Sequence, residues 1–352
     1  MAVPRPLRVL LYRPPWRTGE VYFRAQQVAA HFQDAGHHVT IVAGRPGWRS
    51  VGRLLGWPYR LARADLVFLY PQPLMPFFAL SALWLGRRVV IDHFTSYVRM
   101  ADVSPRIGRV LAPFDRVAYR QADAVLAHTR SVADDLCAIH GLAPRRVHTI
   151  YSVVKTAHFA PVYDRDAAAL RERFGLTGRF VVLYHGMWHP WHGVNVLRSA
   201  VAQLADAGES VSLVMIGHAG ACAPHERLLD EVPFGDLPAH IQMADVWCSG
   251  FTNLPRGDRS LSSTLIQALA MARPVITSPS PEKSAVLRNE ETAFFVPPDD
   301  PATLADSIRH CRRHPDFARR VGKAGRELAK RLFDIAAFDR LLADLTQTWF
   351  GT

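Results

Sequence analysis

The stretch FVVLYHGMWHPWHGVNVL, residues 180–197, contains a strand, a turn and the start of a helix in immediate succession. The apolar run through Tyr184 predicts a buried strand. Gly186 then lets the backbone turn closely, and Gly193 begins a helix whose free N–H groups could hold a phosphate. The pattern also fits an ordinary strand-to-helix turn with surface aromatic side chains. It therefore predicts one unit of an α/β fold and leaves the anion site open.

The remainder of the second half repeats this unit. Further apolar runs, separated by helical sequence, predict four more strands: VSLVMIG (211–217), ADVWCSG (244–250), PVITSP (274–279) and AFFVPP (293–298). Alternation of this kind is typical of a parallel, doubly wound sheet. The last predicted helix has one apolar stripe, which suits a covering helix: Ile335, Phe338, Leu341, Leu342 and Leu345.

The first half follows the same plan. A helix is expected over Gln26–Phe32, and strands are expected at Arg8–Tyr12, His37–Gly44, Leu66–Tyr70, Arg88–Ile91 and Ala124–Ala127. The segment VHTIYSVVKTAHFAP, residues 147–161, interrupts the alternation. The expected fold class is therefore α/β, with two Rossmann-like parallel-sheet domains facing each other across a cleft. Their expected limits are 1–155 and 156–334, and 335–352 is expected to form the covering helix.

Composition places the chain among globular proteins. Of its 352 residues, 49% are hydrophobic and 21% are charged, which excludes a disordered chain. The four cysteines show no metal-ligand spacing, so we expect reduced core thiols, a cytoplasmic protein and no signal peptide: Cys137, Cys222, Cys248 and Cys311. The apolar stretch Leu66–Leu85 contains three prolines, which favours strand, loop and helix over a membrane span.

The net charge of +11 is concentrated in the first half. Residues 1–155 contain 20 Arg and one Lys against nine acidic residues. Two stretches, 45–63 and 104–120, combine Arg with aromatic side chains, which suits an anionic membrane surface; a solvated helix face is the alternative. We therefore expect peripheral contact with the inner face of the membrane through this half. No nucleic-acid-binding module is recognisable, so no nucleic-acid partner is expected.

A second motif, GDRSLSSTLIQALAMARPVI, occupies residues 257–276. Ser262, Ser263 and Thr264 precede a helix expected over Leu265–Met271. Their hydroxyls and the first backbone N–H groups of the helix converge where an anion would be stabilised. Simple helix capping explains the same residues and, for this motif taken alone, is the favoured interpretation.

Taken in order, these segments resemble the retaining glycosyltransferase family 4, of the GT-B fold. Family members have a glycine followed by a basic residue and a Trp-Lys-Gly turn, and later two glutamates eight positions apart before a Pro-Val-Ile strand. GMWHPWHG (186–193) and LIQALAMARPVI (265–276) stand in those places. VLRNEETAFFVPPDDPATLADSI (286–308), RVLLYRPPWRTGE (8–20) and AGHHVTIVAG (35–44) also resemble family segments, so the resemblance covers nearly the whole chain.

The donor-site motif departs from the family pattern. The basic pair that clamps the diphosphate is represented by Met187 and His192, and the glutamate pair falls on Arg259 and Gln267. Gln267 could still hydrogen-bond a ribose hydroxyl, and Arg259 could replace a lost cation. Two readings follow: a divergent enzyme with a rearranged donor site, or a noncatalytic GT-B partner that stabilises another transferase.

The resemblance implies transfer of a sugar from a nucleotide-sugar donor to a polysaccharide, glycolipid or other acceptor, with retention and with no metal or other cofactor. It implies that His93, after a first-domain strand, is catalytic, and that Gly19 lies in the acceptor-side loop. The donor nucleotide stays open among uridine, guanosine and others. The residues expected to bind the donor are Gly186, His192, Arg259, Ser262, Ser263, Thr264 and Gln267.

Overall fold

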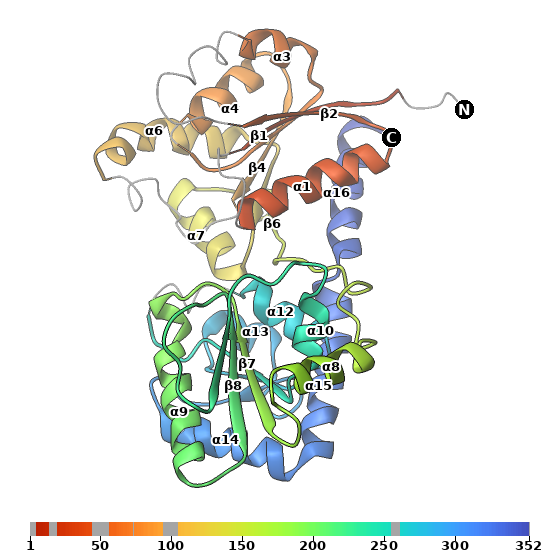
Figure 1. Ribbon diagram of the computed structural model, residues 1–352. Coiled ribbons are helices and arrows are strands. Elements are labelled where there is room, and N and C mark those ends of the chain that lie inside the picture. Colours follow the sequence, from red (N-terminus) through yellow and green to blue (C-terminus); the bar gives the residue numbers. More distant parts are fainter. Residues whose placement is uncertain are drawn as a thin grey trace. The chain divides into compact units, whose positions relative to one another are not determined.

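The computed structural model describes residues 5–13, 20–43, 56–72, 74–93, 105–254 and 261–351 (Figure 1). The chain divides into two compact units. The first unit is Met1–Ile150 with Asp339–Thr352, and the second is Tyr151–Phe338. The sequence placed the boundary at 155 and kept the last helix separate. In the structure, α16 (Ile335–Phe350) begins in the second unit and continues into the first, where Asp339 lies 2.9 Å from His31.

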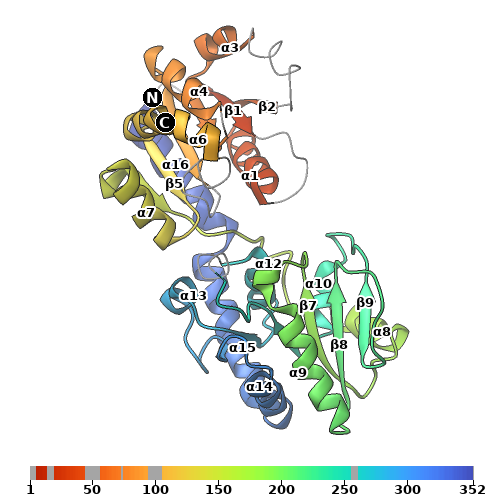
Figure 2. The same ribbon diagram turned by 90° about the vertical axis from the view of Figure 1, so that its left-hand side faces the viewer.

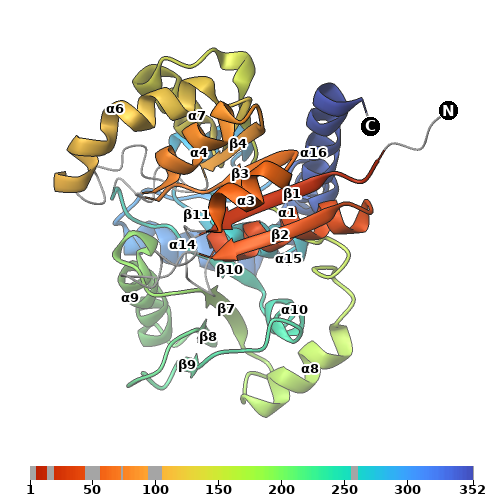
Figure 3. The same ribbon diagram turned by 90° about the horizontal axis from the view of Figure 1, so that it is seen from above.

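The described strands of the first unit form a parallel six-stranded sheet in the order β2-β1-β3-β4-β5-β6. Figure 3 shows β2, β1, β3 and β4 side by side in this order. The strands are β1 (Arg8–Arg13), β2 (His38–Ala43), β3 (Leu66–Leu69), β4 (Arg88–His93), β5 (Ala124–Ala127) and β6 (Val147–Thr149). The helices are α1 (Glu20–Asp34), α3 (Trp57–Arg63), α4 (Met75–Trp84), α6 (Pro105–Gln121), α7 (Arg130–His140) and the 3₁₀ turn η2 (Pro144–Arg146). Strands β3 and β5 are buried at every position, as expected where helices cover both faces of a sheet.

The second unit repeats this architecture with the strand order β12-β11-β10-β7-β8-β9. Its strands are β7 (Phe180–His185), β8 (Val211–Ile216), β9 (Glu226–Leu229), β10 (Val246–Cys248), β11 (Val275–Thr277) and β12 (Phe294–Phe295). Its helices are α8 (Asp164–Arg173), η3 (Pro190–His192), α9 (Val194–Asp206), α10 (Leu237–Gln242), α12 (Ser263–Ala270), α13 (Pro281–Val286), α14 (Pro301–Arg313) and α15 (Pro315–Leu332).

Side chains alternate across the second sheet and build a core on each face. Val182 and Tyr184 pack with residues of α9 and α14, which lie on one face (Figure 2). Val181 and Leu183 pack with residues of α10, α12 and α15 on the other. Because successive strand residues point to opposite faces, a single strand contributes to both cores. This is the two-domain Rossmann-like fold that the alternation predicted.

Several local expectations were corrected by the structure. The supposed interruption at 147–161 begins with β6, a short edge strand, and β9 was not anticipated because its sequence, ERLL, lacks a strand pattern. Leu66–Leu85 does form strand, loop and helix, and none of the described helices is long and apolar enough to cross a membrane. All four cysteines are free thiols, but Cys222 is exposed, so the expectation of core thiols was wrong there.

Candidate active site

The turn between β7 and α9 follows the sequence expectation closely. Gly186 has a φ of 129° and Gly193 a φ of 66°, in regions that side-chain-bearing residues rarely adopt. A Cβ atom at Gly193 would lie 2.9 Å from Cβ of Phe251 and 3.0 Å from its backbone. Gly193 is also the N-cap of α9. Both glycines are therefore required by backbone geometry, whatever binds beside them.

His192 is held in one tautomer by the same turn. Its Nδ1 lies 2.9 Å from the carbonyl oxygen of Met187 and 2.7 Å from the hydroxyl of Tyr184, which itself donates to that carbonyl. Nδ1 must therefore carry the proton, which leaves Nε2 as an acceptor. Burial lowers the pKa of His192 to about 4. At neutral pH the imidazole carries no charge, so it is not the permanent cation that the family pattern has here.

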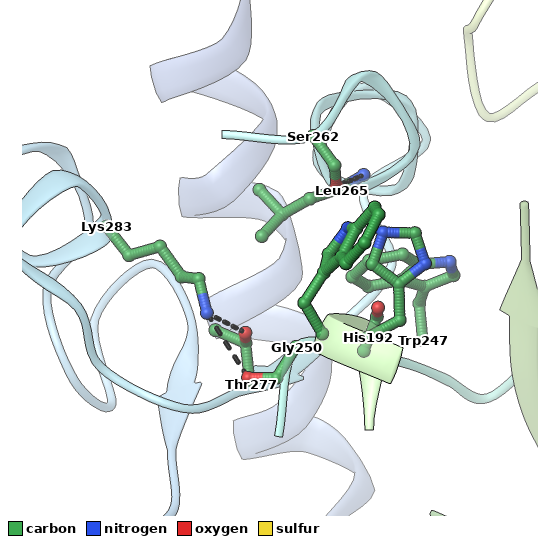
Figure 4. A pocket seen from close by; sticks show the side chains of 9 residues that line it. His192, Trp247, Gly250, Ser262, Leu265, Thr277 and Lys283 are labelled. Atoms are coloured by element: carbon green, nitrogen blue, oxygen red, sulfur yellow. Dashed lines mark hydrogen bonds between the residues drawn. The ribbon is translucent and has the colours of Figure 1, made fainter. Parts of the chain in front are cut away.

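A small pocket opens beside this turn, at the carboxyl ends of β10 and β11 and the N-terminus of α12 (Figure 4). Ligands of open α/β sheets bind in this position, beyond the carboxyl ends of the strands. The pocket is lined by Trp191, His192, Trp247, Ser249, Gly250, Ser262, Leu265, Thr277 and Lys283.

The hydroxyl cluster at the start of α12 caps the helix. Ser262 is the N-cap, and its Oγ accepts a hydrogen bond from the backbone N–H of Leu265 at 3.2 Å. The same Oγ lies 3.1 Å from Oγ1 of Thr264, whose methyl group would be 3.3 Å from a Cβ atom at Gly186. Capping and pocket lining thus coexist at Ser262. Arg259 and Gly19, two further sequence candidates, lie outside the described residues.

Gln267 does not stand alone in the structure. Its Oε1 lies 2.9 Å from Nε2 of His185, at the end of β7, while Nδ1 of His185 accepts from the indole N–H of Trp247 at 2.9 Å. Because Trp247 can only donate, Nε2 of His185 carries the proton and donates to Gln267. Burial lowers the pKa of His185 to about 4. The amide N–H₂ of Gln267 is consequently the part of the side chain that is oriented away from this chain of hydrogen bonds.

Replacing Gln267 by glutamate is expected to raise the pKa of His185 by about one to three, because a carboxylate beside Nε2 favours the imidazolium. The measurement is an NMR titration of the histidine ring nitrogens. Gln203→Glu, an exposed change on α9, is the matched control and should leave this pKa unchanged. An unchanged pKa in the Gln267→Glu variant would contradict the contact between Gln267 and His185.

Sequence reasoning missed Lys283. It lies on α13 after β11, and its Nζ donates to the carbonyl of Ser278 at 2.8 Å and to Oγ1 of Thr277 at 3.1 Å. The signal was available, since the loops after the strands of a parallel sheet are where ligands bind and this lysine lies just after one of them. The motif comparison drew attention instead to positions 187, 192, 259 and 267.

His93 lies at the end of β4 in the first unit. It is buried, and its Nδ1 is 2.6 Å from the hydroxyl of Tyr119, whose ring stacks on His140. Burial lowers the pKa of His93 to about 3. The preceding residue, Asp92, forms a buried ion pair of 3.0 Å with Arg24 of α1. The first unit therefore also gathers polar side chains at the carboxyl end of its sheet, with a neutral imidazole among them.

Comparisons with known proteins agree with this two-unit description. Residues 49–158 match the model of Glycosyltransferase Family 4, and residues 179–314 match that of Glycosyl transferases group 1. The Anabaena protein HepE, solved in complex with UDP and glucose, superposes with a TM-score of 0.76 at 16% identity, covering 97% of this chain and 100% of HepE. A glycosyltransferase from Rickettsia africae superposes with a TM-score of 0.80 at 16% identity, covering 97% and 98%.

Curated relatives are similar in sequence at a lower coverage. Alpha-D-kanosaminyltransferase of Streptomyces kanamyceticus is 24% identical over 272 residues, 74% of this chain and 70% of the relative. Phosphatidyl-myo-inositol mannosyltransferase of Mycobacterium leprae is 30% identical over 168 residues, 45% of this chain and 43% of the relative. D-inositol 3-phosphate glycosyltransferase 1 of Catenulispora acidiphila is 30% identical over 206 residues, 53% and 48%. The chain thus spans less than half the length of the last two.

Proposed function

This chain is a glycosyltransferase of the GT-B fold that resembles family 4, and from that premise we propose that it transfers a sugar from a nucleotide-sugar donor to a polysaccharide, glycolipid or other acceptor with retention of configuration. The donor site is assigned to the second unit. The first unit takes the acceptor side.

The pocket beside α12 is the observation that carries this proposal. It combines the capping hydroxyl of Ser262, the ammonium of Lys283 and the aromatic side chain of Trp191. A diphosphate requires donors and positive charge, and a nucleoside offers flat surfaces that aromatic rings contact well. HepE, which shares the fold, was solved with UDP and with UDP-glucose, which supports a nucleotide-sugar as the donor class.

In the proposed reaction the departing diphosphate is stabilised by hydrogen-bond donors and basic groups of this chain. His192 is neutral before the donor arrives, so it either accepts a hydrogen bond through Nε2 or takes a proton when the anion binds. Gln267 offers its amide N–H₂ to the ligand. The donor-binding residues proposed are Gly186, His192, Arg259, Ser262, Ser263, Thr264 and Gln267.

His93 is proposed to contact the transferred sugar, and Gly19 to belong to the acceptor-side loop. Since the pKa of His93 is lowered to about 3, its imidazole is neutral throughout the physiological range. It would therefore act by hydrogen bonding to a sugar hydroxyl and not as a cation. If transfer depends on His93, the pH dependence of the transfer rate should contain no ionisation of this imidazole between about pH 5 and pH 8.

The test is a transfer assay with UDP-, GDP-, dTDP- and ADP-sugars and a set of lipid-linked and free inositol acceptors, the acceptor types that the names of the relatives suggest. Release of nucleoside diphosphate reports transfer, and the coupling constant of the anomeric proton reports the configuration of the product. A product of inverted configuration would overturn retention. Donor binding with neither transfer nor hydrolysis would favour the noncatalytic partner.

A second proposal is that the first unit binds an anionic membrane surface. Helix α6 exposes Val110, Phe114 and Val117, which lie on one stripe at helical spacing, and it also exposes Arg109 and Arg116. The neighbouring helix α4 packs against α6 and exposes further aromatic side chains at Phe77 and Trp84. Apolar side chains flanked by arginine suit the headgroup region of a bilayer that contains anionic lipids.

Replacing Phe114 by glutamate is expected to weaken binding to phosphatidylglycerol vesicles roughly tenfold or more. The change removes one large apolar contact and introduces a negative charge, which the anionic headgroups repel. Vesicle flotation of the intact chain measures this. Val162→Glu, a change at a 74% exposed position of the second unit, is the control. Equal flotation of both variants and the wild type, or equal binding to phosphatidylcholine vesicles, would contradict the proposal.

A further inference from the structure

A diphosphate bound to the second unit requires positive charge nearby. The family pattern has basic residues at two positions, but this chain has Met187 and His192 there. Met187 is apolar and 67% exposed. His192 has a pKa lowered to about 4 and uses Nδ1 within its own turn. A nucleoside diphosphate carries at least two negative charges at neutral pH, and charge-assisted hydrogen bonds are the strong ones. Arg259, the replacement cation that the sequence suggests, lies outside the described residues, and the described lining of the pocket contains a second cation.

Lys283 is a cation that lines this pocket. The residue is only 6% exposed, and its Nζ donates to the carbonyls of Ser278 (2.8 Å) and Gly250 (3.3 Å) and to Oγ1 of Thr277 (3.1 Å). Figure 4 shows the ammonium approaching the pocket from α13, with Thr277 beneath it and Ser262 and His192 farther along the wall. Three oxygen atoms fix the charge in one place, and burial makes its field stronger than at the surface.

The surroundings of Lys283 link it to the rest of the site. The carbonyl of Gly250 accepts from Nζ, and the backbone N–H of Gly250 donates to the carbonyl of His192 at 2.9 Å. The proximity of the Lys283 ammonium is also one of the causes that lower the pKa of His192. The charge of Lys283 thus acts electrostatically on His192, and both residues are hydrogen-bonded to Gly250.

We propose that Lys283 binds the diphosphate of the nucleotide-sugar donor and takes the place of the missing basic clamp. This proposal rests on the proposed function and names the residue that supplies its charge. The hydrogen bond from Nζ to the carbonyl of Gly250 is the longest of the three. When the donor binds, this N–H turns to a phosphate oxygen, while the hydrogen bonds to Ser278 and Thr277 keep the ammonium in position. Ser262 and Leu265, at the start of α12, line the same pocket, so the N-terminus of this helix offers further donors to the phosphates.

A purely structural lysine would have a different signature. If Lys283 only tied the Gly250 loop to β11, its loss would distort the pocket for every ligand, charged or not. If Lys283 binds the diphosphate, its loss should weaken the binding of a nucleoside diphosphate and leave the binding of the uncharged nucleoside unchanged. The comparison of a nucleoside diphosphate with its nucleoside separates the two roles.

Calorimetric titrations of the intact chain with UDP, GDP, uridine and guanosine test this. Lys283→Met keeps the length of the side chain and removes its charge, and Lys323→Met, on the exposed side of α15, is the matched control. We expect the nucleoside diphosphate to bind Lys283→Met about ten- to a hundredfold more weakly than the wild type. The affinity for the nucleoside should change less than about twofold. The control should match the wild type.

Each alternative outcome is informative. Unchanged binding of the nucleoside diphosphate to Lys283→Met, or equal loss for diphosphate and nucleoside, would overturn the role of Lys283 and leave the proposed function standing. A wild type that binds no nucleoside diphosphate would overturn the donor site itself. If Lys283→Met fails to fold, Lys283→Gln, whose amide can still donate to the carbonyl of Ser278, takes its place with the same expected ratio.

Discussion

Replacing Asp92 by alanine is expected to lower the free energy of unfolding of the first unit by about 3–5 kcal/mol. Asp92 and Arg24 form an ion pair of 3.0 Å in which both side chains are 1% exposed. Burial raises the pKa of Asp92, and Arg24 opposes this effect. Removing the carboxylate leaves the guanidinium buried without its anion, and that desolvated charge accounts for the cost.

Hydrogen exchange at β4, combined with urea denaturation of the intact chain, measures this loss. The control is Arg88→Ala, which breaks an ion pair of 2.6 Å at a partly exposed position and should cost no more than about 1 kcal/mol. If both variants lost the same free energy of unfolding, the buried pair of Asp92 and Arg24 would contribute no more to the stability of the first unit than an exposed pair.

Replacing Gly322 by alanine is expected to destabilise the second unit by about 3 kcal/mol, although alanine favours helix formation. A Cβ atom at Gly322 would lie 2.3 Å from the carbonyl oxygen of Ala272 and 3.0 Å from the backbone nitrogen of Pro274. These are backbone atoms of the turn that enters β11, so they cannot yield by a change of rotamer. Helix α15 would have to move away from that turn.

The thermal melting temperature of the variant measures the effect. Gly235→Ala is the matched control, because a Cβ atom there meets nothing within 4 Å and the φ of Gly235 is not positive. Since β11 ends at Thr277, which lines the pocket, Gly322→Ala should also weaken nucleotide binding. A melting temperature like that of the control would show that α15 packs less closely than described.

Apolar strands could be predicted from the sequence, whereas β6 and β9, which contain polar or charged side chains, could not. The runs that became β3, β5, β7 and β8 are buried at nearly every position, and this leaves a strong signal. Strand β9, with the sequence ERLL, mixes charged with apolar side chains. Its position is fixed by pairing with β8, a tertiary contact that local sequence does not encode.

The backbone of the candidate site was easier to predict than its charges. Gly186 and Gly193 stand out because only a few residue types tolerate their φ angles. The state of His192, by contrast, depends on its burial and on the carbonyl of Met187, and the orientation of Gln267 depends on His185, 82 positions away in sequence. Lys283 was missed because it lies after the Pro-Val-Ile strand, beyond the motif positions that the resemblance covers there. Such assignments require the folded chain.

The second unit is proposed to hold a nucleotide-sugar donor. A thermal-shift screen of the intact chain against uridine, guanosine, thymidine and adenosine diphosphates and their sugars, without added metal, tests it most directly, because a ligand that binds only the native state raises the melting temperature. We expect the melting temperature to rise with the concentration of one nucleotide class, and the rise to be smaller in Lys283→Met. The absence of a rise with every nucleotide would contradict the donor site and favour a noncatalytic partner of another transferase.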